Sequence, residues 1–502
     1  MAVESVTLPA PFGGLDLVTP IDQMEPQFAL DLINLFPAPT APEMRKGYVE
    51  LDDLGTALTV KTLTSLPLQS GSTQLVAISG GNIFSLVGGV TTTVTGTTPI
   101  TENACQTTVF ANRLFIVNGT DVAQVYNGTT TADSTFTGVS LSSLVNVSSY
   151  KSRLYFVQEN TLSFWYGGTN AVGASALTQE DLQYVFTRGG FLVFAGSYTN
   201  QTAQTSADLF FACSSEGEIL FYAGSSPAGA PTGDWGIVAR YFIGKPLGYN
   251  AFVRVNNDIW ILTQQGIVPI SVLFASDPQQ ATETIGGRIN PLLSRYAAIF
   301  PFSYRWHGVF NPTTRRVYLA VPVSATETCI LAWSIDSKAW CKYGLYSQSD
   351  DIMVTVAGTD TFYGSDDGII YTAETGYTDK GFPIDLTIEM PFSFYGVRGN
   401  YKNWKDVRPL IQTQRGVGYQ IAMNTDFRRQ APSGTITTGP GATTFWGAPW
   451  GSSWSGGLEY IYDRASLKGQ GHSGSIYMKV SVNDSAFKLF GFEVRFEIGG
   501  QV

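Results

Sequence analysis

The stretch RRVYLAVPVSATETCILAWSIDSKAWCKYG, residues 315–344, decides the fold class of this chain. Val317, Leu319 and Val321 alternate with other side chains, and the same period of two returns over residues 330–334, which predicts two neighbouring strands. A short polar turn and an aromatic-rich run then add a further hairpin. One such unit has an exposed edge and cannot bury its own face, so we ask whether the chain repeats it.

The pattern recurs seven times, each time as a polar residue or two followed by two short β-branched or aromatic runs. The copies begin at Gln74, Asn112, Ser152, Ala207, Asn257, Arg315 and Thr359. Their spacing is close to the roughly 40 to 50 residues expected of propeller blades, with loop insertions accounting for the longer intervals. An ordinary β-sandwich of regular hairpins is the alternative. We therefore predict an all-β chain with a β-propeller of six to eight blades over residues 51–384.

The composition supports the all-β class and points to contacts between subunits. Glycine is abundant, with 53 residues, and 13% of the chain is aromatic. Only 14% of residues are charged, which is low for a monomer with its whole surface in water, and extensive subunit contact would explain it. A net charge of −10 argues against a protein that grips nucleic acid through its phosphates, but not against one that lets nucleic acid slide past.

The two ends of the chain differ from the repeats. Residues 1–50 predict an extended arm that docks, with a short helical patch at 26–32 and a proline-punctuated run ending at Arg45 and Lys46. Residues 385–502 predict a second, sandwich-like β-domain, interrupted by a Gly- and Thr-rich loop with three tryptophans, which is typical of an interface. The predicted interface residues are Leu15, Phe28, Arg45, Lys46, Trp446, Trp450 and Trp454.

The start of the chain has neither a basic region nor an apolar leader, and no apolar run approaches the roughly 20 residues of a membrane span. We expect a soluble protein that takes no secretory route and does not insert into membranes. One helix is predicted outside the arm, because Ile289, Leu292, Leu293 and Tyr296 fall at helical spacing.

Residues suited to catalysis are scarce. His307 and His472 are the two histidines of the chain, and neither is accompanied by a nucleophile elbow or a catalytic cysteine signature. We expect no enzyme, no catalytic residues and no cofactor. Histidine-rich metal sites are excluded by count, whereas a carboxylate cage for Ca²⁺ stays open. The four cysteines are interpreted as small buried hydrophobes, with a pairing of Cys329 and Cys341 as the alternative.

Acidic residues could still be catalytic, because propeller glycosidases use carboxylates that spacing along the sequence does not reveal. The segment SDDGIIY from Ser365 resembles the Asp-box hairpin of sialidase-like propellers, in which an acidic residue caps a turn ahead of a buried aromatic. That motif is structural in those proteins, so it predicts a blade and not an active site.

Both ends of the chain resemble the tail nozzle proteins of short-tailed bacteriophages, which include head-to-tail stabilisation and tubular tail proteins. The segments that carry the resemblance are GGLDLVTP from Gly13, ALDLINLFP from Ala29, RKGY from Arg45, WKDVRPLI from Trp404, WGAPWGSSW from Trp446, GQGHSGSIYMKV from Gly469 and GFEVRFEIGG from Gly491.

The resemblance implies a structural protein of the virion tail that is assembled in the host cytoplasm. It implies a homohexameric tube that extends the portal channel, bound above to an adaptor protein and below to a tail needle, fibre or spike. Double-stranded DNA would be retained and then conducted through the lumen without sequence-specific binding, and a negative lumen would keep the duplex from sticking. The alternative is a carbohydrate-binding or glycoside-hydrolysing propeller, for which we expect a secreted monomer.

Overall fold

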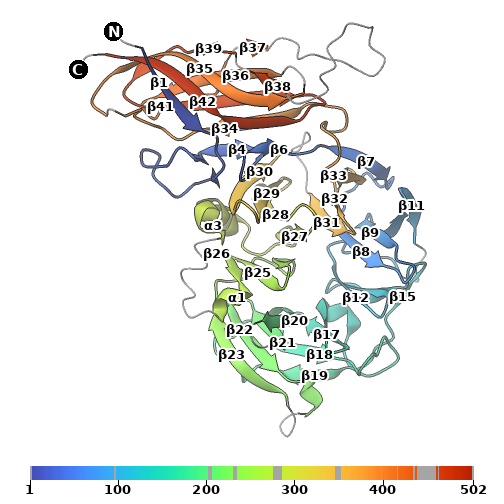
Figure 1. Ribbon diagram of the computed structural model, residues 1–502. Coiled ribbons are helices and arrows are strands. Elements are labelled where there is room, and N and C mark those ends of the chain that lie inside the picture. Colours follow the sequence, from blue (N-terminus) through green and yellow to red (C-terminus); the bar gives the residue numbers. More distant parts are fainter. Residues whose placement is uncertain are drawn as a thin grey trace.

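A ring of small sheets and a stack of longer strands above it make up the protein (Figure 1). The computed structural model describes residues 3–94, 96, 98–201, 206–229, 234–274, 285–344, 352–396, 398–414, 417–433, 436–437, 459–461 and 463–499. Nearly all of the regular structure in these residues is β-strand, so the predicted all-β class is confirmed.

The ring is a β-propeller. Each blade is an antiparallel sheet, and its strands follow one another in sequence order from the centre of the ring to the rim. Six blades are small sheets of their own: β8–β11 (Thr62–Pro67, Thr73–Ser79, Asn82–Val87, Val90–Thr93), β12–β15 (Gln106–Phe110, Arg113–Val117, Gln124–Tyr126, Thr131–Asp133), β16–β19 (Leu144–Tyr150, Arg153–Gln158, Ser163–Tyr166, Thr178–Asp181), β20–β23 (Leu192–Gln201, Ser206–Ser214, Glu218–Ala223, Gly236–Phe242), β24–β26 (Phe252–Val255, Asp258–Thr263, Gly266–Pro269) and β31–β33 (Met353–Ala357, Asp360–Gly364, Ile369–Ala373) with β7 (Tyr48–Asp53).

A further sheet fills the gap between the last two of these. Strands β27–β30 (His307–Asn311, Arg316–Pro322, Thr328–Ser334, Ala339–Tyr343) lie between β24 and β31 and contact both. We number the blades 1 to 7 along the chain, so this is blade 6. Blade 7 contacts blade 1 through β31 and β8, which closes the ring.

The repeats predicted from the sequence coincide with the blades. Each of the seven copies covers the second and third strands of one blade; the copy at residue 315, for example, contains β28 and β29. Val317 pairs with Trp333 and Leu319 with Leu331 across these strands, and all four side chains are buried. Alternating apolar residues therefore mark the strands whose two faces are covered by the neighbouring blades.

The N-terminal segment supplies the outermost strand of blade 7. Strand β7 pairs antiparallel with β33, with Glu50 opposite Tyr371. The ring of Tyr48 packs edge-on against the rings of Tyr363 and Tyr371, with centroids 5.2 Å apart in both pairs. Because the first and last parts of the propeller share one sheet, the ring is held shut by hydrogen bonds between segments far apart in sequence.

The C-terminal domain consists of two facing sheets. One contains β35 (Lys402–Thr413) and β42 (Phe487–Ile498), flanked by β38 (Glu459–Ile461), β39 (Ala465–Ser466), β40 (Gln470–Gly471) and the N-terminal strands β1 (Val3–Pro9), β5 (Leu35–Phe36) and β6 (Glu43–Met44). The other contains β34 (Ile384–Glu389), β41 (Gly474–Val482), β36 (Gly418–Thr425) and β37 (Ile436–Thr437). Alternate residues of β41 and β42, such as Met478 and Val494, are fully buried, as in a sandwich core.

Strand β4 (Asp31–Ile33) joins the two domains (Figure 1). It lies parallel to β30, with Ile33 opposite Lys342, and antiparallel to β34, with Leu32 opposite Ile388. The result is one nine-stranded sheet in the order β27-β28-β29-β30-β4-β34-β41-β36-β37. Propeller and sandwich therefore share a continuous sheet whose middle strand comes from the N-terminal segment.

The helical patch predicted at 26–32 is wrong. Phe28–Ala29 form β3, which pairs parallel with β2 (Gly14–Leu15), and the chain continues into β4. Sheets on both sides offer hydrogen bonds to this segment, and they override its helical spacing. The helix predicted around Leu293 is confirmed as η3 (Gly287–Ile289) followed by α3 (Asn290–Ile299). The other short helices are α1 (Ile270–Leu273), η1 (Leu141–Ser143) and η2 (Pro227–Gly229).

Candidate functional site

A buried arginine forms the centre of the junction between the two domains. Arg45, just after β6, is 1% exposed. It donates hydrogen bonds from Nη1 to Oδ1 of Asp379 at 2.7 Å, from Nε to Oδ1 of Asn34 at 2.8 Å and from Nη2 to the carbonyl of Gly344 at 2.6 Å. Its guanidinium carbon lies 4.7 Å from the ring centroid of Tyr343. The planar fork of arginine suits this set of partners, which a single ammonium group would not satisfy.

These partners come from three parts of the chain: the N-terminal segment, the end of blade 6 and the connection after blade 7. Burial alone would lower the pKa of Arg45, but Tyr343 and the ion pair with Asp379 raise it, so the guanidinium stays charged. Asn34 also donates from Nδ2 to the carbonyl of Asp385, at the start of β34, over 2.8 Å. We call Arg45, Asp379 and Asn34 the junction triad.

Most of the predicted interface residues that the structure describes are buried by other residues of the same chain. Leu15, Phe28 and Arg45 are buried, and Arg288 covers the ring of Phe28 at 3.8 Å from its centroid. Of the four in the N-terminal segment, Lys46 alone is exposed. The prediction that the other three contact a partner is corrected, because the segment packs between its own two domains. Trp446, Trp450 and Trp454 lie outside the described residues.

A cleft of about 600 Å³ lies beside the junction, between blades 6 and 7 and the C-terminal domain. Four of its charged side chains are engaged with one another: Arg316 lies 3.4 Å from a carboxylate oxygen of Glu374 and 3.6 Å from one of Glu43, and Lys488 lies 3.5 Å from another oxygen of Glu43. Such mutual neutralisation stabilises the contact between the domains.

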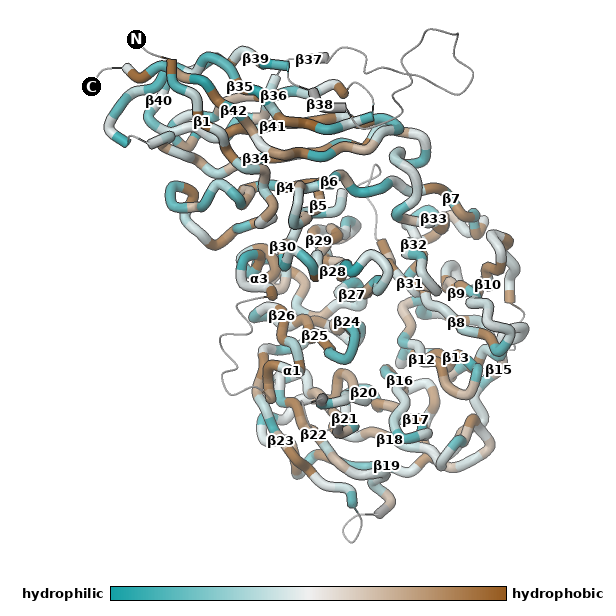
Figure 2. The backbone as a smooth tube through the Cα atoms, in the orientation of Figure 1, coloured by the Kyte–Doolittle hydropathy of each residue, from teal (hydrophilic) through white to brown (hydrophobic). Residues whose placement is uncertain are grey.

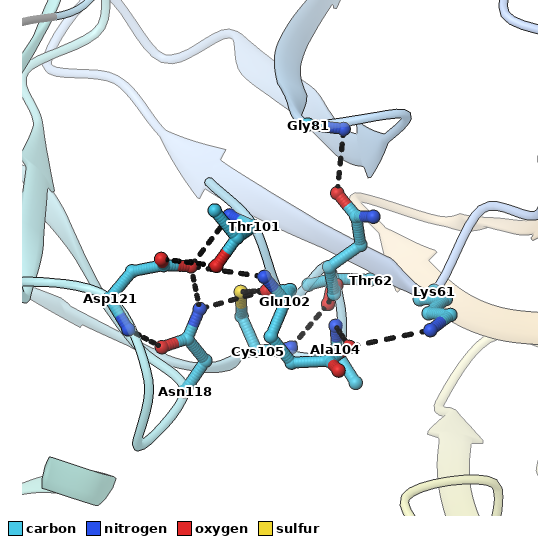
Figure 3. A network of polar contacts seen from close by, with 10 residues as sticks. Lys61, Thr62, Gly81, Thr101, Glu102, Ala104, Cys105, Asn118 and Asp121 are labelled. Carbon is cyan, nitrogen blue, oxygen red and sulfur yellow. Dashed lines mark hydrogen bonds and ion pairs between the residues drawn. The ribbon is translucent and has the colours of Figure 1, made fainter. Parts of the chain in front are cut away.

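A second polar network joins blades 1 and 2 (Figure 3). The carboxylate of Asp121 accepts hydrogen bonds from the backbone of Thr101 at 2.7 Å and of Glu102 at 3.0 Å, and from the side chain of Asn118 at 2.8 Å. Burial raises the pKa of Asp121, but these hydrogen bonds outweigh it and lower the pKa below its usual value. The network fixes the connection between the two blades.

His307 and the four cysteines take part in packing and in hydrogen bonds between blades. His307 accepts a hydrogen bond at Nε2 from the backbone N–H of Val354 at 3.0 Å, which ties blade 6 to blade 7. All four cysteines are free thiols, and burial raises the pKa of Cys105 to about 12 and that of Cys329 to about 11. In the part of the chain that the structure describes, no group of three His, Cys, Asp or Glu could hold a metal ion, and no helix is long and apolar enough to span a membrane.

The outermost strand of blade 4 has an exposed apolar surface. Strand β23 pairs with β22 on one side, and Ile237, Val238 and Phe242 are between 45% and 54% exposed. Tyr184, 93% exposed, lies nearby, since Arg240 of β23 donates to the carbonyl next to it in sequence. Figure 2 shows hydrophobic segments along β22 and β23. We call Tyr184, Ile237, Val238 and Phe242 the blade 4 edge patch.

The sequence singled out Arg45 but not its two partners in the junction triad, and it did not single out this patch. Asp379 and Asn34 lie far apart in sequence and neither carries a motif, so only the fold brings them to Arg45. For β23, the run GIVARYF from Gly236 has β-rich composition, but the repeated pattern covers only the second and third strands of each blade and so does not include it.

No protein-family model matches the chain, and no curated protein matches its sequence. Among solved structures, the chain is similar to the computationally designed Ika8 protein, with 9% sequence identity and a TM-score of 0.37 over 65% of this chain and 99% of that one. A likeness at this level carries no argument about function. The propeller architecture rests on the strand pairing described above.

Proposed function

We propose that this chain is a structural subunit of a virion tail, the nozzle, which assembles with copies of itself into a homohexameric tube. The proposed tube extends the portal channel and binds an adaptor protein above and a needle, fibre or spike below. It retains double-stranded DNA and then conducts it during ejection. The resemblance of both chain ends to such proteins motivates the proposal.

The blade 4 edge patch is the observation that carries it. An outer strand with apolar side chains on both faces and one row of unpaired backbone groups is a template for pairing with another chain. Tyrosine and large apolar side chains are also enriched where subunits meet. A ring of identical subunits provides a heterologous surface of this kind, which each copy buries against its neighbour.

The shared nine-stranded sheet supports the same proposal. A tube that holds a packaged genome needs subunits whose two domains do not move independently. Continuous strand pairing through β4, together with the buried junction triad, couples propeller and sandwich more strongly than a flexible linker would. Strand β4, Asn34 and Arg45 lie in segments that carry the resemblance.

The test is the mass of the purified protein, alone and with its adaptor, by light scattering. Six times the subunit mass of 54.3 kDa is expected in at least one of the two conditions. A monomer at all concentrations in both, combined with binding to an immobilised glycan, would favour the carbohydrate-binding alternative and overturn the proposal.

Variants locate the contact. Val238→Lys on β23 places a charge in the patch and is expected to shift the protein from hexamer to monomer. Val90→Lys, at an exposed position on the outermost strand of blade 1, is the matched control and is expected to keep the wild-type mass. Equal behaviour of the two variants would exclude blade 4 as the site of subunit contact.

A further inference from the structure

The tripeptide Asn-Gly-Thr occurs twice in the chain, at residues 118–120 and 127–129, both times in a turn of blade 2. An asparagine followed by glycine can lose its side-chain amide, because glycine has no side chain to hinder attack by its backbone nitrogen on the asparagine Cγ. The two copies have the same local sequence, so a difference in their reactivity is expected to come mainly from the fold.

The two asparagine side chains have one contact in common. The Oδ1 of Asn118 accepts hydrogen bonds from the backbone N–H groups two and three residues further on, at 3.0 and 2.8 Å. The Oδ1 of Asn127 accepts the equivalent pair, at 2.9 Å each. These hydrogen bonds therefore do not distinguish the two sites.

The atoms of Asn118 and Gly119 that would react are both held by the fold. The Nδ2 of Asn118, which would leave, donates to the carbonyl of Glu102 and to Oδ2 of Asp121, at 2.8 Å each (Figure 3). The backbone nitrogen of Gly119, which would attack, donates to the carbonyl of Leu144 at 2.8 Å. Ring closure at this site therefore requires three hydrogen bonds to break.

Asn127 is held far more weakly. Its side chain is exposed, and its Nδ2 reaches the hydroxyl of Thr130, another exposed residue, at 3.3 Å. Among the residues that the structure describes, the backbone nitrogen of Gly128 has no hydrogen-bond partner. The carbonyl of Gly128 accepts a hydrogen bond from Nε2 of Gln74 at 3.1 Å, so this turn lies at the contact between blades 1 and 2.

We propose that Asn127 is a site of spontaneous deamidation in the folded protein, and that the fold protects Asn118 from the same reaction. Hydroxide removes the proton of the Gly128 N–H, and the nitrogen attacks Cγ of Asn127 while the bond from Cγ to Nδ2 breaks. Nδ2 takes up a proton from water and leaves as ammonia, and the product is a five-membered succinimide. Water then opens this ring to aspartate or isoaspartate, which adds a negative charge to the turn at neutral pH. The inference does not depend on the proposed tail function.

The test is peptide mass spectrometry of the full-length chain during incubation in mildly alkaline buffer, with the modified fraction measured at both asparagines over time. Asn127 is expected to react at least tenfold faster than Asn118, because the additional hydrogen bonds at Asn118 must break before the ring closes. The rate at Asn127 is expected to rise in proportion to the hydroxide concentration. Asn127→Gln is expected to abolish the modification in this turn.

The same chain unfolded in urea is the matched control. Without the fold, the two copies of Asn-Gly-Thr are expected to react at similar rates. Two results would overturn the proposal. One is a rate at Asn118 in the folded chain that equals or exceeds the rate at Asn127. The other is an unmodified Asn127 in the folded chain under conditions that modify the unfolded chain.

Discussion

At position 45 a single guanidinium satisfies three separate segments of the chain. An ion pair buried this deeply contributes little net stability compared with well-packed apolar groups, but breaking it leaves a charge without a partner. The main effect of Arg45 is therefore on the specificity of the fold: it determines which segments meet at the junction, and in which register.

Replacement of Arg45 by Met is expected to lower the free energy of unfolding by about 3–5 kcal/mol, because Asp379 stays buried without a counter-charge. Urea denaturation followed by fluorescence measures this. The control is Lys46→Met, an exposed neighbour for which a change within about 0.5 kcal/mol is expected. Equal losses in the two variants would show that the junction triad has no special energetic role.

Asp121 predicts a dependence of stability on pH. Its folded pKa is lowered, so its contribution is fully present above the unfolded value near 3.8 and is lost as the pH falls through the lower folded value. Asp121→Asn is expected to cost about 1 kcal/mol at pH 7, a modest figure because the carboxylate is partly exposed, and almost nothing well below pH 3. Denaturation midpoints at both pH values test this, with Asp22→Asn as the control. A loss that is the same at both pH values would contradict the assignment.

Among the elements, β7 has the largest consequence for its size, because one strand completes the last blade. Deletion of residues 1–53 removes it together with β4 and two members of the junction triad, Asn34 and Arg45. We expect the truncated chain to lose its cooperative unfolding transition or to aggregate, since blade 7 and the nine-stranded sheet are both left with open edges. Size-exclusion chromatography and circular dichroism test this.

The matched control for that deletion removes residues 1–9 alone. It takes away β1, an edge strand of the sandwich, and is expected to reduce stability while leaving the fold and its cooperativity intact. If the longer deletion has the same unfolding midpoint as the shorter one, the closure of the ring does not depend on β7.

The blade elements were predictable from sequence and the joining elements were not. The alternation of Val317, Leu319 and Val321 is local, and it recurs because every blade has the same burial. Strand β4 has three residues, and its partners lie about 300 and 350 residues further on, so no local period identifies it. The apolar residues around Phe28 are buried because the segment lies between two domains. Their spacing along the sequence matches that of an amphipathic helix, although the segment forms strands.

For the whole molecule, the shared sheet predicts that propeller and sandwich unfold together. Leu32→Pro removes a backbone donor in β4 and is expected to split the calorimetric transition of the wild type into two. Leu32→Ala leaves the backbone pairing intact and is the control: we expect a loss of about 2–5 kcal/mol, from the cavity it creates, within a single transition. A single transition in the proline variant would show that the domains are coupled by other contacts.

The pairing of the two chain ends also sets an order of events during synthesis. The hydroxyl of Ser5 donates to Glu493, 488 residues further along, within the pairing of β1 and β42. At about 5–20 residues per second, a ribosome takes roughly 25–100 s to make these 502 residues. Strand β1 has no partner until β42 is made near the end of that time, whereas β7 and β4 can pair earlier, with β33 and β34. A chain that stops before β42 therefore leaves β1 without its partner strand. The sandwich is the last part of the fold to close, after all the propeller blades have been made.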